Sequence, residues 1–151
     1  MATTSTTHHA PHAASAGAAH PKKSSRYTEA VGRRKTAIAR VRLSAGSGKM
    51  TVNGKDAKAY FTLPRLVAAA KAPVEHLKLD EYDISVKVAG GGIHAQAEAV
   101  RLGLARAIVA KSPDWKPQLR TMGYMTRDSR MVERKKYGKR KARRSPQWAK
   151  R

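Results

Sequence analysis

The last twenty-five residues, 127–151, constrain this chain more than any other stretch. Twelve of them are Lys or Arg and two are acidic, so the segment carries a net charge of +10 out of +22 for the whole chain. Its few apolar residues follow neither the 3.6-residue period of a helix nor the two-residue period of a strand. Such a segment cannot bury a core, and its charges repel one another until an anion neutralises them. We therefore expect a long, extended basic tail that binds a polyanion.

The side chains of this tail indicate phosphate as the anion. A tail that only kept the protein soluble would mix charges of both signs or favour acids. Arginine is abundant here, and its planar fork can give two hydrogen bonds to one phosphate. Trp148 adds a flat surface for stacking on a base or a sugar. The cations that we expect to neutralise phosphates are Arg134, Lys135, Lys136, Lys139, Arg140, Lys141, Arg143 and Arg144.

The 151 residues correspond to one domain with extensions. Residues 26–126 also carry a net charge of +10, so the globular part is expected to lie against the polyanion as well. No stretch approaches the roughly 20 apolar residues of a membrane-spanning helix, so we expect no membrane partner. The absence of cysteine excludes disulfides and thiolate chemistry and suits a reducing compartment.

Residues 1–25 are rich in Ala, Thr, Ser and His and contain almost no large apolar side chain. This composition predicts a disordered N-terminal extension, and the apolar core of a signal peptide is missing. No arginine precedes Arg26, which disfavours a transit peptide, so we expect a cytoplasmic protein in preference to an organellar one. The histidines of this extension have no fixed geometry, and we expect no metal site there.

Alternating side chains predict strands in the first half of the domain. Residues 36–43 place Ala and aliphatic side chains on one face and mostly cations on the other. Residues 45–48 are expected to form a hairpin turn to a second strand at 50–52. Residues 56–72 are expected to form two short helices, with Pro64 in the first turn of the second and Pro73 as its stop.

The second half contains the clearest signals. Alternation over 82–88 predicts a strand, and residues 97–108 have the three- and four-residue spacing of an amphipathic helix that ends at Ser112-Pro113. A further short helix is expected at 114–122. Interleaved strands and helices, with one long helix over the sheet, predict an α/β two-layer sandwich of roughly 100 residues.

Two glycine-rich segments resemble nucleotide-binding loops. The segment 45–49, AGSGK, lacks the first glycine and the hydroxyl residue of a P-loop, because Leu43 and Met50 occupy those positions. Gly90, Gly91 and Gly92 precede the long helix, where backbone N–H groups can bind a phosphate of a nucleic-acid backbone. An equally weighted alternative is that these glycines only relieve crowding between strand and helix.

A second cationic cluster precedes the first predicted strand. Arg33, Arg34 and Lys35 are followed on the strand's polar face by Arg40 and Arg42, and we expect all five to contact phosphates. No acid, histidine or hydroxyl pattern forms a catalytic constellation, so we expect no enzyme activity, no cofactor and no small-molecule substrate.

Three stretches together resemble the bacterial small-subunit ribosomal protein S9 family. They are GRRKTAIARVRL at 32–43, GGGIHAQAEAVRLGLARAI at 90–108, and TRDSRMVERKKYG at 126–138, which continues to Arg151. The resemblance covers about residues 27–151 and leaves out the N-terminal extension. It implies a non-enzymatic structural constituent of the ribosome that binds small-subunit rRNA in the head, beside neighbouring ribosomal proteins.

The resemblance also implies a role for the end of the tail and details of the fold. The tail would thread through rRNA toward the P-site tRNA, where Lys150 and Arg151 approach the backbone of the anticodon stem. The implied sheet has about four strands in mixed orientation with helices packed on it, and one left-handed crossover. Periodicity does not give that handedness, since the general rule predicts the right-handed form.

Two other functional classes remain compatible with the residues themselves. The charge alone would equally suit an architectural DNA-binding protein, which discrimination between A-form RNA and duplex DNA would separate. A small phosphotransferase that uses the glycine segment is the other class, and retention of ATP by the purified protein would support it.

Overall fold

The computed structural model describes residues 27–150, which contain five strands, four α-helices and one 3-10 helix. The predicted N-terminal extension, 1–25, lies outside the described residues. The elements follow one another as β1 (Thr28–Arg34), β2 (Ala37–Ala45), β3 (Met50–Val52), β4 (Lys55–Asp56), α1 (Ala57–Tyr60), α2 (Pro64–Leu77), β5 (Tyr82–Ala89), α3 (Ile93–Lys111), η1 (Pro113–Trp115) and α4 (Lys116–Thr121).

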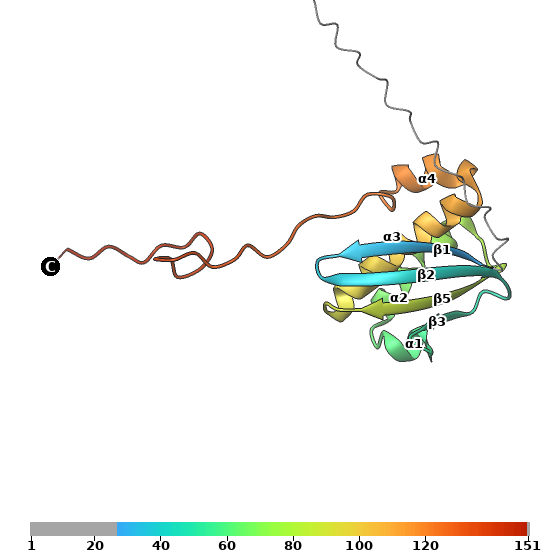
Figure 1. The fold of residues 1–151 in the computed structure, drawn as a ribbon, viewed down its shortest axis with the longest axis horizontal. Coiled ribbons are helices and arrows are strands. Elements are labelled where there is room, and N and C mark those ends of the chain that lie inside the picture. Colours follow the sequence, from blue (N-terminus) through green and yellow to red (C-terminus); the bar gives the residue numbers. More distant parts are fainter. Residues whose placement is uncertain (1–26, 151) are drawn as a thin grey trace, which may run out of the picture.

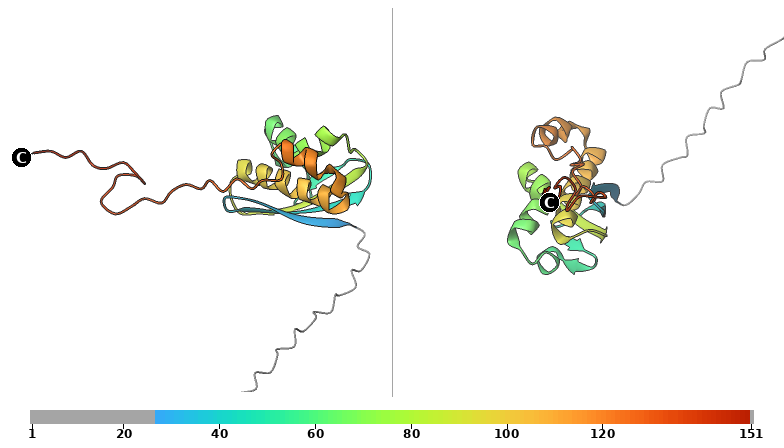
Figure 2. Two further views of the ribbon diagram at one scale, coloured as in Figure 1. Left: turned by 90° about the horizontal axis from the view of Figure 1, so that it is seen from above. Right: turned by 90° about the vertical axis from the view of Figure 1, so that its left-hand side faces the viewer.

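The strands form one mixed sheet in the order β1-β2-β5-β3-β4. β1, β2 and β5 are antiparallel neighbours, whereas β3 runs parallel to β5. The helices cover one face of this sheet and leave the other open (Figure 1; Figure 2, left). The predicted two-layer α/β arrangement is therefore present, with five strands instead of about four because the two-residue β4 adds an edge.

The predicted hairpin at residues 45–48 is wrong. β5 lies between β2 and β3, so this segment passes the end of β5 instead of joining two neighbours. The Asp83 carboxylate holds the segment by accepting hydrogen bonds from the backbone N–H groups of Ser47 (2.9 Å) and Lys49 (3.0 Å). Both bonds lower the pKa of Asp83, and the bond from Lys49 has the larger effect. The residue types at 45–48 favour a turn, but they do not determine which strands become neighbours, because tertiary packing decides that.

The chain returns from β3 to the parallel strand β5 through α1 and α2. This is the connection to which the implied left-handed crossover refers, and its hand stays a prediction. Asn53 extends the β3–β5 pairing beyond β3, because its side-chain amide exchanges two hydrogen bonds with the backbone of Val88. Asn53 and Gly54 both have positive φ and form the tight turn into β4.

Helix α2 does not end at Pro73 as predicted but continues to Leu77. A proline inside a helix removes one backbone hydrogen bond and crowds the preceding turn. Here the ring of Pro73 is fully buried on the same helix face as Leu66, Ala70 and Val74, so apolar packing offsets that loss. The predicted start of α2 is confirmed, with Pro64 in its first turn.

The core lies between the sheet and helix α3. The inward side chains of β2 and β5 are buried, as their alternation predicts, and they share one core with α3. Helix α3 is buried round most of its circumference instead of on one face, because α2 packs against it as well as the sheet. The predicted end of α3 at Ser112 and the short helix that follows are also confirmed. Among the described residues, no helix is both long and apolar enough to cross a membrane.

Strand β1 was not predicted, although it forms the edge of the sheet beside β2. Its inward positions after Thr28 are Ala30, Gly32 and Arg34, and they show no apolar alternation. Gly32 allows α3 to approach the strand closely, since a Cβ there would overlap the Ala99 carbonyl oxygen and the Gly103 amide nitrogen. Close packing by small residues thus takes the place of an aliphatic stripe.

Candidate nucleic-acid interface

The open face of the sheet carries a patch of cations, which we call the sheet patch. Arg33 on β1, Arg40 on β2 and Lys87 on β5 are all exposed there, and Arg40 and Lys87 are register partners. Ile38 lies beside them and is 41% exposed. The patch therefore combines charge with a small apolar surface and has no helix over it (Figure 2, left).

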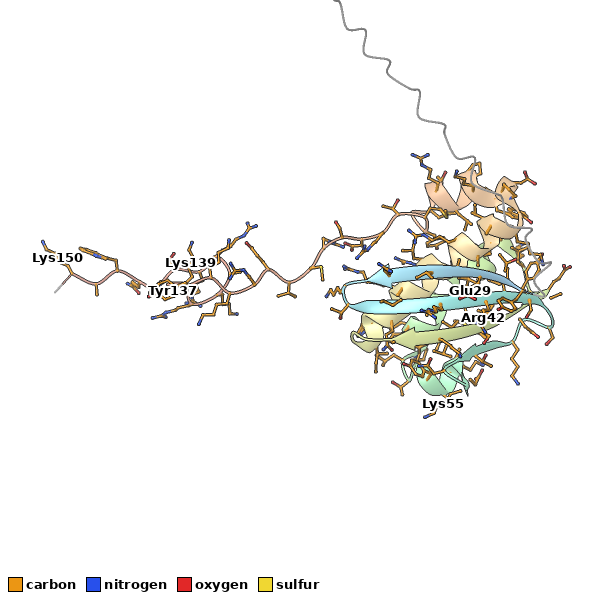
Figure 3. The ribbon with its side chains drawn as sticks, in the orientation of Figure 1. Glu29, Arg42, Lys55, Tyr137, Lys139 and Lys150 are labelled. Atoms are coloured by element: carbon orange, nitrogen blue, oxygen red, sulfur yellow. The ribbon has the colours of Figure 1, made fainter. Side chains whose placement is uncertain are left out.

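Arg42 lies on the same face but already has two partners in the domain. Its Nε atom donates to Glu29 at 3.2 Å, and its guanidinium lies over the Tyr27 ring at 4.7 Å. Glu29 and Arg42 are register partners on adjacent strands (Figure 3). A phosphate contact from Arg42 would have to compete with this carboxylate, so Arg42 is a weaker candidate than Arg40.

A second group of candidate phosphate contacts lies where the β1–β2 turn meets the start of α3. We call this part of the molecule the tail end of the domain. Lys35 occupies the turn with a positive φ of 50°, and its side chain is exposed. The turn packs against the glycine segment so closely that a Cβ on Gly90 would come within 2.7 Å of the Thr36 carbonyl oxygen. Lys35 and the first turn of α3 therefore lie at one end of the domain, from which the tail departs (Figure 1).

The glycine segment satisfies both interpretations of its sequence. Gly90 and Gly91 have φ values of 70° and 67°, and a Cβ on Gly91 would lie 2.9 Å from the Ala37 Cβ, so close packing requires glycine. Gly92 caps α3, and no side chain caps the exposed first turn of this helix. Free N–H groups at a helix start attract anions, so steric need and phosphate binding are compatible here.

Arg34 does not belong to either exposed cluster, so its predicted phosphate contact is less favoured than those of Arg33 and Lys35 and stays a prediction. It is only 9% exposed because its side chain points inward from β1. Its Nε donates to the Glu98 carboxylate at 2.5 Å, and its Nη2 lies 3.0 Å from the Asp128 carboxylate. Its Nη1 also donates to the Arg130 carbonyl oxygen at 2.6 Å. Arg34 thus ties the first residues of the tail to β1 and α3.

Asp128 is the acidic centre of this attachment. It accepts hydrogen bonds from the Arg130 side chain and from the Arg130 backbone N–H. These bonds, followed by the nearby charges of Arg130 and Arg34, hold the pKa of Asp128 well below its usual value of 3.8. Because the folded-state pKa is lowered, the contribution of the ionised Asp128 is present above its usual pKa of 3.8 and is lost as the pH falls through the lowered pKa.

Replacing Arg34 with methionine is expected to release the start of the tail. The substitution keeps much of the buried volume but removes every bond to Glu98, Asp128 and the Arg130 carbonyl. Losing hydrogen bonds of a charged donor should raise tryptic cleavage after Arg130 by roughly tenfold or more. Site-resolved mass spectrometry during limited proteolysis measures this rate. Arg40→Met is the matched control, and equal rates in both variants would contradict the attachment.

Beyond Arg130 the tail leaves the domain and forms no helix or strand up to residue 150 (Figure 1). Two of its predicted phosphate contacts are paired internally, since Glu133 accepts from Lys136 at 2.8 Å and from Arg143 at 2.9 Å. In the described part of the chain, no carboxylate pairs with the six others, which are Arg134, Lys135, Lys139, Arg140, Lys141 and Arg144.

The last residues of the tail extend furthest from the domain. Lys150 is exposed near the end of the tail (Figure 3), and Arg151 lies outside the described residues. Trp148 is 81% exposed. Between residues 27 and 150, no group of His, Asp and Glu is arranged to hold a metal ion.

Sequence reasoning missed two features of this interface. Lys87 belongs to the sheet patch, and the alternation of 82–88 already placed it on the polar face, but only the β2–β5 register puts it beside Arg40. Glu98 and Asp128 are the partners of Arg34, and they lie 64 and 94 positions away in the sequence. No local pattern connects residues at such separations.

Comparison with known proteins places this arrangement in a family. The chain matches the family model described as ribosomal protein S9/S16 over residues 32–151. The small ribosomal subunit protein uS9 of Nostoc punctiforme is 57% identical over 122 residues, which cover 80% of this chain and 88% of that protein. The uS9 protein of Cytophaga hutchinsonii is 54% identical over 123 residues, covering 81% of this chain and 96% of that protein. The match contains the sheet patch, the glycine segment and the whole tail, and the chain therefore belongs to the ribosomal protein S9 family.

Proposed function

We propose that this protein is a structural constituent of the small ribosomal subunit that binds rRNA in the head through both its domain and its tail. The observation that carries the proposal is the set of exposed cations on three parts of a member of this family. Exposed cations occupy the open sheet face, the tail end of the domain and the tail itself. Phosphate contacts of this kind fix position and orientation and do not read base sequence.

The domain and the tail would bind rRNA in different ways, because their shapes differ. The domain offers a rigid surface in which Arg33, Arg40 and Lys87 are held on strands, with Lys35 and Gly90–Gly92 at the tail end. The tail offers a thin basic segment that fits a crevice between RNA helices. RNA shape, together with ordering of the tail on contact, would supply the specificity. We propose no catalytic role and no cofactor, and the expected site of action is the cytoplasm.

The test of this proposal is a competition between nucleic acids at matched salt. A fragment of small-subunit rRNA that contains head helices should bind more tightly than duplex DNA of the same phosphate count, because the surface fits folded RNA. Equal affinity for both would favour the architectural DNA-binding class. Binding of ATP with no preference for RNA would favour the phosphotransferase class.

We further propose that the end of the tail contacts the P-site tRNA. Lys150 is exposed near the far end of the tail, and Arg151 follows it in the sequence. Two cations there would neutralise phosphates of the anticodon stem regardless of codon sequence. The neighbouring ribosomal proteins of the head would be the remaining partners.

Deleting Lys150 and Arg151 is expected to weaken tRNA binding to the P site without changing rRNA binding. Losing about two phosphate contacts should lower the tRNA affinity roughly tenfold at low salt, equally for different codons. Filter binding of tRNA to reconstituted subunits measures the effect. Lys55→Gln is the control, since Lys55 lies at the edge of the domain, far from the end of the tail (Figure 3). An unchanged affinity would rule out this role for the tip.

A further inference from the structure

Tyr137 is the one tyrosine of the described chain that has no packing role. Tyr60 packs edge-on against Phe61, Tyr82 lies under the Lys111 ammonium group, and Tyr124 lies near Arg101. Tyr27 contacts Arg42. Tyr137, in contrast, is fully exposed and lies partway along the tail (Figure 3). Its apolar surface therefore contributes nothing to the stability of the domain.

The backbone around Tyr137 is nevertheless ordered by the chain's own contacts. Glu133 closes the segment by accepting hydrogen bonds from the side chains of Lys136 and Arg143, which lie three and ten positions away. The Arg140 N–H donates to the Arg144 carbonyl oxygen at 2.8 Å. Gly138, with a φ of 70°, makes the turn directly after Tyr137. We call residues 133–144 the tail loop, and it is visible as a loop partway along the tail (Figure 1).

The Glu133 carboxylate is well suited to hold this loop at neutral pH. Hydrogen bonds from Lys136 and then from Arg143 lower its pKa from the ordinary value of 4.5. The carboxylate is therefore ionised well below pH 7, and its contribution to loop order is lost only when the pH falls through the lowered pKa. A loop that is already formed loses less conformational entropy when it binds a partner.

The chemistry around the ring points to RNA bases. Six cations without carboxylate partners in the described chain belong to the same loop, namely Arg134, Lys135, Lys139, Arg140, Lys141 and Arg144. They would neutralise the backbone of a single-stranded segment, whose unstacked bases then lie within reach of the ring. Aromatic side chains in basic surfaces bind such bases by stacking. We propose that the tail loop presents Tyr137 as a stacking surface for an unpaired rRNA base, an inference that rests on the proposed function.

The test is a pair of substitutions compared over a range of salt concentrations. Tyr137→Leu keeps an apolar side chain but removes the ring, and it should lower rRNA affinity roughly tenfold at every salt concentration. Because stacking releases no counterions, the slope of log K against log salt should not change. Tyr137→Phe keeps the ring and should bind like the parent protein. Lys139→Gln is the matched control, since it should make the slope less steep by about one unit.

A second variant tests whether the loop itself matters. Glu133→Gln weakens the closing contacts, so in that background Tyr137→Leu should lose only a few-fold in affinity, since the ring is no longer held in place. If Tyr137→Leu binds like the parent while the parent shows steep salt dependence, the stacking inference is wrong and the proposed function stands. A loss of affinity with an altered slope would also overturn the stacking inference. If the parent protein shows no salt-dependent rRNA binding, both are wrong.

Discussion

Raising the salt concentration from 50 to 200 mM is expected to lower the affinity of the full chain for small-subunit rRNA roughly ten-thousandfold. Domain and tail together are expected to neutralise about eight phosphates, about three of them through the domain, which gives a log–log slope near −7. A chain that ends at Thr126 keeps only the domain cations and should show a slope of about −3, which corresponds to a loss of roughly sixtyfold. Titration of a labelled rRNA fragment at four or more salt concentrations measures both slopes.

The internal contacts of the tail refine this expectation. Glu133 competes with phosphates for Lys136 and Arg143, so replacing these two cations together with Gln should change the slope less than replacing Arg140 and Lys141. The second pair has no carboxylate partner in the described chain. Equal slopes for the full chain and for the chain ending at Thr126 would mean that the tail does not neutralise phosphates.

Replacing Gly32 with alanine is expected to destabilise the domain by about 3 kcal/mol or more, at the upper end of overpacking effects. The added methyl group would overlap backbone atoms of α3, the Ala99 carbonyl oxygen and the Gly103 amide nitrogen. Backbone cannot change rotamer to relieve an overlap, so α3 would have to move away from β1. The inward Arg34 lies on the same strand two positions further, and its contact with Glu98 on α3 would be strained as well.

Urea denaturation, followed by the circular dichroism of the folded domain, measures the loss in the free energy of unfolding. Gly92→Ala is the matched control, because a Cβ there meets no atom within 4 Å and its φ of −96° suits any residue. The control should lose at most about 1 kcal/mol, because alanine is a poorer N-cap than glycine. A Gly32→Ala variant that unfolds with the control would mean that β1 and α3 are not packed as closely as described.

Sequence reasoning succeeded where one local period decides the structure. The alternation in β2 and β5 places apolar side chains on one face of each strand, and both faces are buried. The helical spacing predicted α3, but its buried residues extend round most of the helix, because α2 packs against it as well as the sheet. It failed for β1, because the inward residues Gly32 and Arg34 are typical of a loop. Only the close packing of α3 explains why they lie in a strand. The helix stop at Pro73 failed for a similar reason, since burial of the ring outweighs the local penalty.

The candidate interface was also predictable only in part. Exposed cations can be recognised from composition, and Arg40 and the unpaired tail cations lie on the surface as a basic pattern suggests. Arg34 cannot be separated from Arg33 and Lys35 by sequence alone, because only its inward position on β1 and its distant partners distinguish it. The closing contact between Glu133 and Arg143 was hidden for the opposite reason, since a single acid among many bases gives no pattern.

The most direct test of the account is sedimentation in a sucrose gradient at moderate salt, with protein-depleted small subunits and with duplex DNA offered separately. The account predicts that the full chain sediments with the small subunits, that the chain ending at Thr126 does so more weakly, and that neither prefers DNA. Full-length protein that stays at the top of the gradient, or that sediments with DNA instead, would contradict the central claim that this basic surface is built to bind ribosomal RNA.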